Sequence, residues 1–223
     1  MNIMDRIRHR QAQAGAPSRA VPAPQRPEML YIGCVDARLD PIDDIGINKG
    51  AALIFRNIGA LVLKDEATPK PGTIPANASI GAVLEFFIHH IPAREETIKH
   101  VVVSGHTDCG GLRACQREEC GEGNRHLARY LESIRDVRDR VRRKAQDKGW
   151  DEAHLLREFE EESVRQSIRN LQTYPAVKRA LKEGTLAIHG WVLDTATRSI
   201  SEMDLGTLRF EPMALKIVAE REG

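Results

Sequence analysis

The chain of 223 residues lacks any uninterrupted apolar stretch of the roughly 20 residues that a membrane-spanning helix needs. Its opening segment, MNIMDRIRHRQAQAG, also lacks the apolar centre of a secretory signal peptide. Net charge is nearly absent too, because 33 basic and 32 acidic side chains leave only +1. These absences argue against a membrane span, a secretory leader and a general attraction to nucleic acid. We therefore expect a cytoplasmic protein that acts on a small-molecule substrate, without nucleic-acid or membrane partners.

Cysteine is scarce as well, with four residues in the whole chain. In a reducing compartment such cysteines indicate metal binding or reactivity more than disulfides. Cys34 and Cys109 stand beside other residue types that bind metals, whereas Cys115 and Cys120 do not. The spacing of the latter two is not the CxxC of a thioredoxin-like site, so a redox function for them is disfavoured.

The length fits one well-buried domain better than two. Residues 11–27 are rich in Ala, Pro, Gln and Arg, which bury too little apolar surface to order themselves. We interpret residues 1–27 as a flexible or wrapping N-terminal arm. Residues 28–223 are then predicted to form a single α/β domain.

Short apolar runs predict strands that are buried on both faces. These runs are MLYIGCV (29–35), AALIF (51–55) and HVVVSG (100–105). A hairpin is predicted near the end of the chain, from TLAIHGWVLD (185–194) to TRSISEMD (197–204).

Helical spacing of apolar residues predicts a crossover helix over 79–90, followed by amphipathic helices over 126–146 and 151–171. Strands that alternate with helices favour an α/β fold. We expect a mostly parallel central sheet with helices on both faces and an antiparallel edge strand.

Two motifs follow two of the predicted strands. Cys34, Asp36 and Arg38 alternate after the first strand, so an extended backbone would project all three to one side. His106 and Cys109, in GHTDCGG (105–111), follow the third strand and share a face once the chain turns helically. Open α/β sheets place their ligand crevice at the carboxyl ends of parallel strands, and both motifs fall there.

Two thiolates and one imidazole suit zinc and leave a fourth position free, as in a catalytic site. Taken singly, a cysteine that ends a buried strand is usually a small apolar filler. A structural zinc site would close all four positions, and Cys115 is a candidate fourth ligand only if its loop folds back. The combination of both motifs favours a catalytic zinc site.

CVDAR (34–38) and GHTDCGG resemble the CxDxR and HxxC motifs of the beta-class carbonic anhydrases. The similarity spans about 25–205 and extends to FRNIGALV (55–62), ESVRQSIRNLQTYPAV (162–177) and LAIHGWVLD (186–194). The resemblance implies a beta-carbonic-anhydrase-like fold, one Zn²⁺ per subunit, and reversible hydration of carbon dioxide to bicarbonate and a proton.

The same resemblance implies that Cys34, His106 and Cys109 are zinc ligands. It makes Asp36 and Arg38 the catalytic dyad, with Asp36 also able to bind the metal in a closed resting state. The presence of the whole set argues against a catalytically silent carbonic-anhydrase-like binding or scaffold subunit.

Gln25, nine residues before Cys34, matches a family glutamine that hydrogen-bonds substrate, and Arg56 matches an arginine near the subunit boundary. Family members form homodimers or dimers of dimers. The chain departs from the family in its N-terminal arm and in Asp108, which would add negative charge near the metal if it pointed inward. Carbonyl sulfide and carbon disulfide hydrolases resemble the same family, so these substrates stay alternatives.

Overall fold

The computed structural model describes residues 3–4, 25–66, 74–92, 98–118 and 123–213. Its centre is a six-stranded sheet in the order β2-β1-β3-β4-β5-β6. The strands are β1 (Met29–Cys34), β2 (Ala52–Asn57), β3 (Lys99–His106), β4 (Leu186–Leu193), β5 (Ile200–Met203) and β6 (Phe210–Pro212). The first four are parallel and the last two antiparallel, so the predicted mostly parallel sheet with an antiparallel edge is confirmed. Most of the predicted arm, 1–27, lies outside the described residues.

Helices lie at all three ranges that the apolar spacing predicts, 79–90, 126–146 and 151–171, and the structure adds short helices and one division that it did not predict. They are α2 (Pro41–Ile45), α3 (Ala78–Glu85), α4 (Gly110–Arg117), α5 (Arg125–Leu131), α6 (Arg135–Lys148), α7 (Glu152–Leu171) and α8 (Pro175–Lys182). A 3₁₀ turn, Glu132–Ile134, separates α5 from α6, so the single helix expected over 126–146 is two helices. Among the described residues, no helix combines the length and apolar character that a membrane crossing requires.

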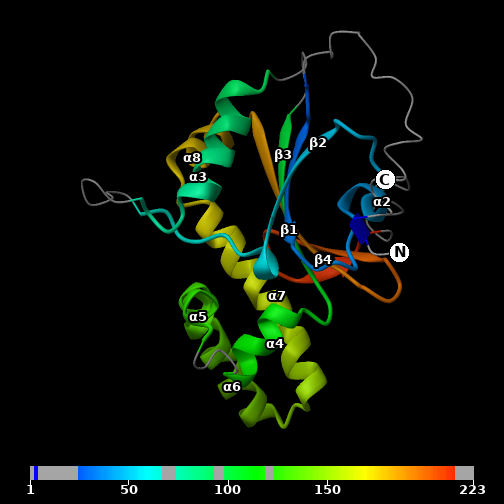
Figure 1. Ribbon diagram of the computed structural model, residues 1–223, viewed down its shortest axis with the longest axis vertical. Helices are drawn as coiled ribbons and strands as arrows, with labels where there is room; N and C mark the ends of the chain where they lie inside the picture. Colours follow the sequence, from blue (N-terminus) through cyan, green and yellow to red (C-terminus); the bar gives the residue numbers. More distant parts are fainter. Residues whose placement is uncertain (1–2, 5–24, 67–73, 93–97, 119–122, 214–223) are drawn as a thin grey trace.

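The two faces of the sheet are covered unequally (Figure 1). Alternate strand residues such as Leu30, Ile32 and Val101 form the main core with α3, α7 and α8. The opposite face carries a smaller cluster of Tyr31, Val102 and Trp191, against which Ile45 of α2 packs. This alternation is what a strand with both faces buried requires.

Helix α7 lies close against β3 and β4 because glycines face it. A Cβ atom at Gly105 would lie 2.7 Å from Cγ2 of Val164, and one at Gly190 would lie 3.1 Å from Cγ1 of the same valine. Only glycine allows so close an approach without displacing the helix. The approach brings the middle of α7 next to the loop that follows β3.

Lys99 at the start of β3 is buried against the end of the crossover helix. Its ammonium group donates to the carbonyl oxygens of Phe87 (2.8 Å), Ile88 (2.9 Å) and Ile91 (2.5 Å). These carbonyls lie where the π-helical turn Phe86–His90, which continues α3, comes to an end. Lys99 therefore caps a helix C-terminus, where the helix dipole favours a positive charge.

A second apolar cluster lies beyond the carboxyl ends of the strands, where α4, α5 and α6 pack beside α7 (Figure 1). It contains three of the cysteines, Cys34, Cys109 and Cys115, together with residues such as Leu112 and Phe159. The predicted ligand crevice therefore has an apolar wall made by helices.

Candidate metal centre

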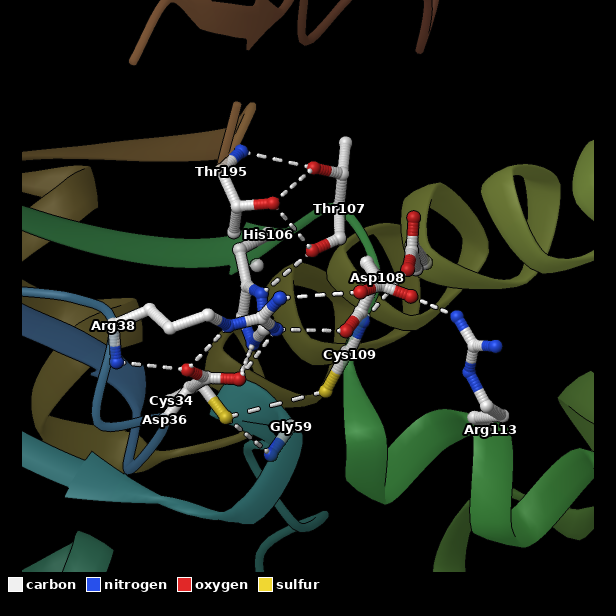
Figure 2. Close-up of polar contacts among 12 residues, drawn as sticks. Cys34, Asp36, Arg38, Gly59, His106, Thr107, Asp108, Cys109, Arg113 and Thr195 are labelled. Carbon is white, nitrogen blue, oxygen red and sulfur yellow. Dashed lines mark hydrogen bonds and ion pairs between the residues drawn. The ribbon is translucent and has the colours of Figure 1, made fainter. Parts of the chain in front are cut away.

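Three predicted ligands meet at the carboxyl edge of the sheet. Cys34 ends β1, His106 ends the neighbouring strand β3, and Cys109 stands immediately before α4 (Figure 2). One donor atom from each lies within 4.8 Å of the others, and all three residues are buried. The two sulfur atoms are 4.0 Å apart.

This arrangement fits zinc in both distance and chemistry. Two sulfurs bound to a tetrahedral zinc at about 2.3 Å would lie about 3.8 Å apart, close to the separation seen here. Nδ1 of His106 lies 2.9 Å from the carbonyl oxygen of Thr107, so this nitrogen must carry the ring proton of the neutral imidazole. Nε2 is buried without a hydrogen-bond partner among the described residues, and a buried polar atom of this kind needs a partner. A divalent cation supplies one.

The two thiols influence each other strongly. The pKa of Cys34 is lowered chiefly because its sulfur accepts a hydrogen bond from Cys109; the nearby His106 ring and the N–H of Gly59 lower it further. The pKa of Cys109 is raised because it donates to Cys34 and is itself buried. Two thiolates 4.0 Å apart in a buried site repel each other, and a cation between them would remove that repulsion.

Asp36 and Arg38 lie beside this cluster (Figure 2). Nε and Nη2 of Arg38 donate to Oδ1 and Oδ2 of Asp36 at 2.9 and 2.7 Å. These bonds hold the pKa of the Asp36 carboxyl well below its usual range. Oδ2 of Asp36 is 3.9 Å from Nε2 of His106, so the carboxylate borders the metal cluster while paired with arginine.

Other predicted candidates lie elsewhere. Cys115 is buried, with its sulfur 3.9 Å from the carbonyl oxygen of Leu131, and it is not part of the ligand cluster. Cys120 lies outside the described residues. Gln25 is exposed and precedes β1, whereas Cys34 ends it, so the length of the strand, roughly 17 Å, separates them. The structure therefore does not bring Gln25 to the metal cluster of its own chain.

Arg56 supports the first ligand loop from the neighbouring strand β2. Its Nε donates to the carbonyl oxygen of Cys34 at 2.7 Å and its Nη2 to that of Asp36 at 2.6 Å. Sequence reasoning placed Arg56 near a subunit boundary and did not predict these contacts. Because Arg56 binds both of these carbonyl oxygens, it restricts the backbone that carries the side chains of Cys34 and Asp36.

Glu160, in the middle of α7, is a further neighbour that the motifs did not reveal. Its Oε1 accepts the N–H of Cys109 at 3.0 Å, and the residue is only 2% exposed. Burial raises the pKa of this carboxyl to about 7. The available signal was its place in the row Leu156, Glu160, Val164, where a charged residue interrupts an apolar stripe.

Comparison with known proteins settles the family. A family model described as carbonic anhydrase matches residues 29–200. The chain belongs to the carbonic anhydrase family. Its relatives include carbonic anhydrase 1 of Escherichia coli O157:H7, with 32% identity over 85% of this chain and 80% of that protein. The carbonic anhydrase of Pseudomonas aeruginosa is 29% identical over 85% of this chain and 79% of that protein.

Solved structures identify the class of carbonic anhydrase. The beta-carbonic anhydrase CafA of Aspergillus fumigatus is 28% identical with a TM-score of 0.66, covering 81% of this chain and 76% of that one. The beta-carbonic anhydrase CcaA shares the fold at a TM-score of 0.72 and 22% identity, covering 94% and 90% of the two chains. As a beta-class carbonic anhydrase, this chain is a zinc lyase that interconverts carbon dioxide and bicarbonate.

Proposed function

We propose that Cys34, His106 and Cys109 hold the catalytic zinc ion, and that Asp36 and Arg38 form the dyad that serves it. The observation that carries this proposal is the buried group of three donor atoms within 4.8 Å. One of them, Nε2 of His106, has no hydrogen-bond partner in the described part of the chain. Three protein ligands leave a fourth position for reaction, as in other catalytic zinc sites.

Bound zinc would act as a Lewis acid that generates a hydroxide nucleophile near neutral pH. The chain supplies the orientation. Asp36 stays ionised because Arg38 lowers its pKa, so its carboxylate can accept a hydrogen bond from the nucleophile and direct its lone pair at carbon dioxide. Arg38 also keeps that carboxylate from becoming a fourth ligand, a position that Asp36 would occupy in a closed resting state.

A homodimer or dimer of dimers would explain the position of Gln25. A beta-carbonic anhydrase of Sordaria macrospora, described as tetrameric, is 26% identical to this chain with a TM-score of 0.66, over 80% of this chain and 81% of that one. Because Gln25 lies at the far end of β1 from Cys34, its proposed contact with substrate requires a second copy. Light scattering should show an assembly larger than a monomer, and an active monomer would contradict this part.

We further propose a cytoplasmic location and a single domain over 28–223. The continuous sheet from β1 to β6 and the absence of a membrane-crossing helix among the described residues support these proposals. Fractionation of cells that express the tagged protein would test the location.

The decisive experiment measures zinc content and stopped-flow hydration of carbon dioxide for the wild type and for Asp36→Asn. The variant keeps the three ligands and the shape of the side chain, so we expect one zinc per subunit in both proteins. Its kcat should fall by about 10² to 10⁴-fold because the oriented carboxylate is lost.

Other outcomes separate the alternatives. Undiminished turnover in Asp36→Asn would remove the role of the dyad. A zinc-loaded wild type without hydration would indicate a binding subunit, and faster turnover of carbonyl sulfide or carbon disulfide than of carbon dioxide would indicate the related hydrolases.

A further inference from the structure

Arg38 is shared between two carboxylates, one from each ligand loop. Besides its two bonds to Asp36, its Nη1 donates to Oδ2 of Asp108 at 3.1 Å and its Nη2 to the carbonyl oxygen of Asp108 at 2.9 Å (Figure 2). All three nitrogens of the guanidinium are therefore engaged. Asp108 does not point into the metal cluster as an added negative charge; it points to the arginine that faces the cluster.

Asp108 is itself held in place. Its backbone is left-handed, with φ of 59°, a conformation that Asp and Asn tolerate better than most residues. Arg113, one turn into α4, donates from Nη2 to Oδ1 of Asp108. Four side chains thus alternate in charge across the mouth of the site, in the order Asp36, Arg38, Asp108 and Arg113 (Figure 2).

We propose that Asp108 is a positioning residue for carbon dioxide hydration, which acts by fixing Arg38 on Asp36, and that Arg113 fixes Asp108 in turn. This inference rests on the proposed function of the metal centre. It differs from the roles assigned above because the Asp108 carboxylate contacts Arg38 and Arg113 and acts through Arg38.

The physical reason is the exposure of the arginine. The side chain of Arg38 is 46% exposed, and one ion pair at such a site competes with water and with other rotamers. A second anchor on the opposite loop removes that freedom, because the guanidinium can leave Asp36 only by breaking bonds to both loops. With Arg38 displaced, Oδ2 of Asp36, 3.9 Å from Nε2 of His106, would be free to occupy the fourth metal position.

The test compares Asp108→Asn, Arg113→Gln and a control, Arg117→Gln. Asparagine keeps the tolerance for a left-handed backbone and one acceptor oxygen, and loses the charge. Arg117 lies on the same helix with similar exposure, 44% against 38% for Arg113, and pairs with Glu152 of α7. The control therefore removes an arginine charge from α4 without touching Asp108.

For the zinc-loaded enzymes, we expect kcat to fall about tenfold in Asp108→Asn and about threefold in Arg113→Gln, with KM and zinc content unchanged. Arg117→Gln should match the wild type. A double-mutant cycle provides the sharper measurement. If Asp108 acts through Arg38 on Asp36, Asp108→Asn should have no further effect on kcat once Asp36→Asn is present.

A second measurement is independent of turnover. In cobalt-substituted protein at one fixed pH, the visible spectrum of Asp108→Asn should differ from that of the wild type, because Asp36 enters the coordination sphere more often. The same substitution should leave the spectrum of Asp36→Asn unchanged.

An unchanged spectrum and unchanged kcat in Asp108→Asn would overturn the proposal. Additive effects in the cycle would overturn it too, as would a loss of stability or zinc with normal turnover per zinc-loaded molecule. A wild type that binds zinc but does not hydrate carbon dioxide would refute the proposed function instead, and the cobalt spectra would still decide whether Asp108 positions Arg38.

Discussion

Lys99 and Glu160 are both charged side chains in buried surroundings at opposite ends of strand β3, and they are stabilised in different ways. Lys99 opens the strand and donates to three carbonyl oxygens at a helix end. Glu160 lies beyond the other end and accepts one N–H, that of the metal-loop residue Cys109. The contrast shows that hydrogen bonds within the fold satisfy the buried charge of Lys99, whereas Glu160 is held next to the metal centre at a cost in stability.

The largest expected effect is that of replacing Lys99, whose ammonium group is fully hydrogen-bonded. Lys99→Met would keep most of the side-chain volume but leave three buried carbonyls without their donor, so we expect the free energy of unfolding to fall by about 3 kcal/mol. Hydration activity per folded, zinc-loaded molecule should not change. Urea denaturation and stopped-flow assays measure the two quantities.

Lys178→Met is a matched control, since Lys178 is exposed on α8. It should leave stability near the wild-type value. An equally small effect of Lys99→Met would show that the cap contributes little and would break the comparison.

The next effect concerns pH. Burial raises the pKa of Glu160 from 4.5 to about 7, so between these values the folded chain holds a proton that the unfolded chain has released. The contribution of Glu160 to stability is therefore present at low pH and is lost as pH rises to about 7, by about 2 to 3 kcal/mol. Glutamine cannot ionise, and Glu160→Gln should lack this loss.

The measurement is urea denaturation of metal-stripped protein at pH 5 and pH 8. The gap between the wild type and Glu160→Gln should widen in favour of the variant at pH 8. Glu183→Gln, at an exposed position after α8, should keep the wild-type dependence. Parallel curves for the wild type and Glu160→Gln would mean that Glu160 does not titrate in this range.

The smallest expected effect concerns the contact between β3, which begins with Lys99, and α7, which carries Glu160. A methyl group in Gly105→Ala would meet Cγ2 of Val164 at 2.7 Å, and we expect a loss of about 1 to 2 kcal/mol as α7 shifts. Because α7 carries Glu160, zinc should also dissociate faster into a chelator. Gly110→Ala adds the same methyl where nothing lies within 4 Å and should not be destabilised.

Much of the fold could be predicted because strands buried on both faces of a parallel sheet consist of consecutive apolar residues, which the sequence shows directly. The runs at 29–35 and 100–105 became β1 and β3, and adjacency of these strands brought Cys34 and His106 together. The break between α5 and α6 was hidden, since Leu131, Ile134 and Val137 keep helical spacing across the 3₁₀ turn.

The supports of the site could not be predicted from the same patterns. Glu160 and Cys109 are 51 residues apart in the sequence, and Arg38 and Asp108 are 70 apart, so no local spacing pattern predicts either contact. The Glu160 contact depends on how closely α7 approaches the sheet, which packing at Gly105 and Gly190 decides. The Arg38 contact depends on the pairing of β1 with β3, which places their following loops side by side. The sequence motifs predict which side chains could bind a metal. The residues that support these side chains can be identified only from the tertiary structure.

The outermost antiparallel strand has a consequence for self-association. Strand β6 has three residues and ends in Pro212, which has no amide hydrogen to offer to an incoming chain. Short edges interrupted by proline are poor templates for strand addition, the first step of many aggregates. Replacement of this proline by a β-branched residue would lengthen the edge strand that has free backbone N–H groups, and it should increase the tendency of the protein to polymerise.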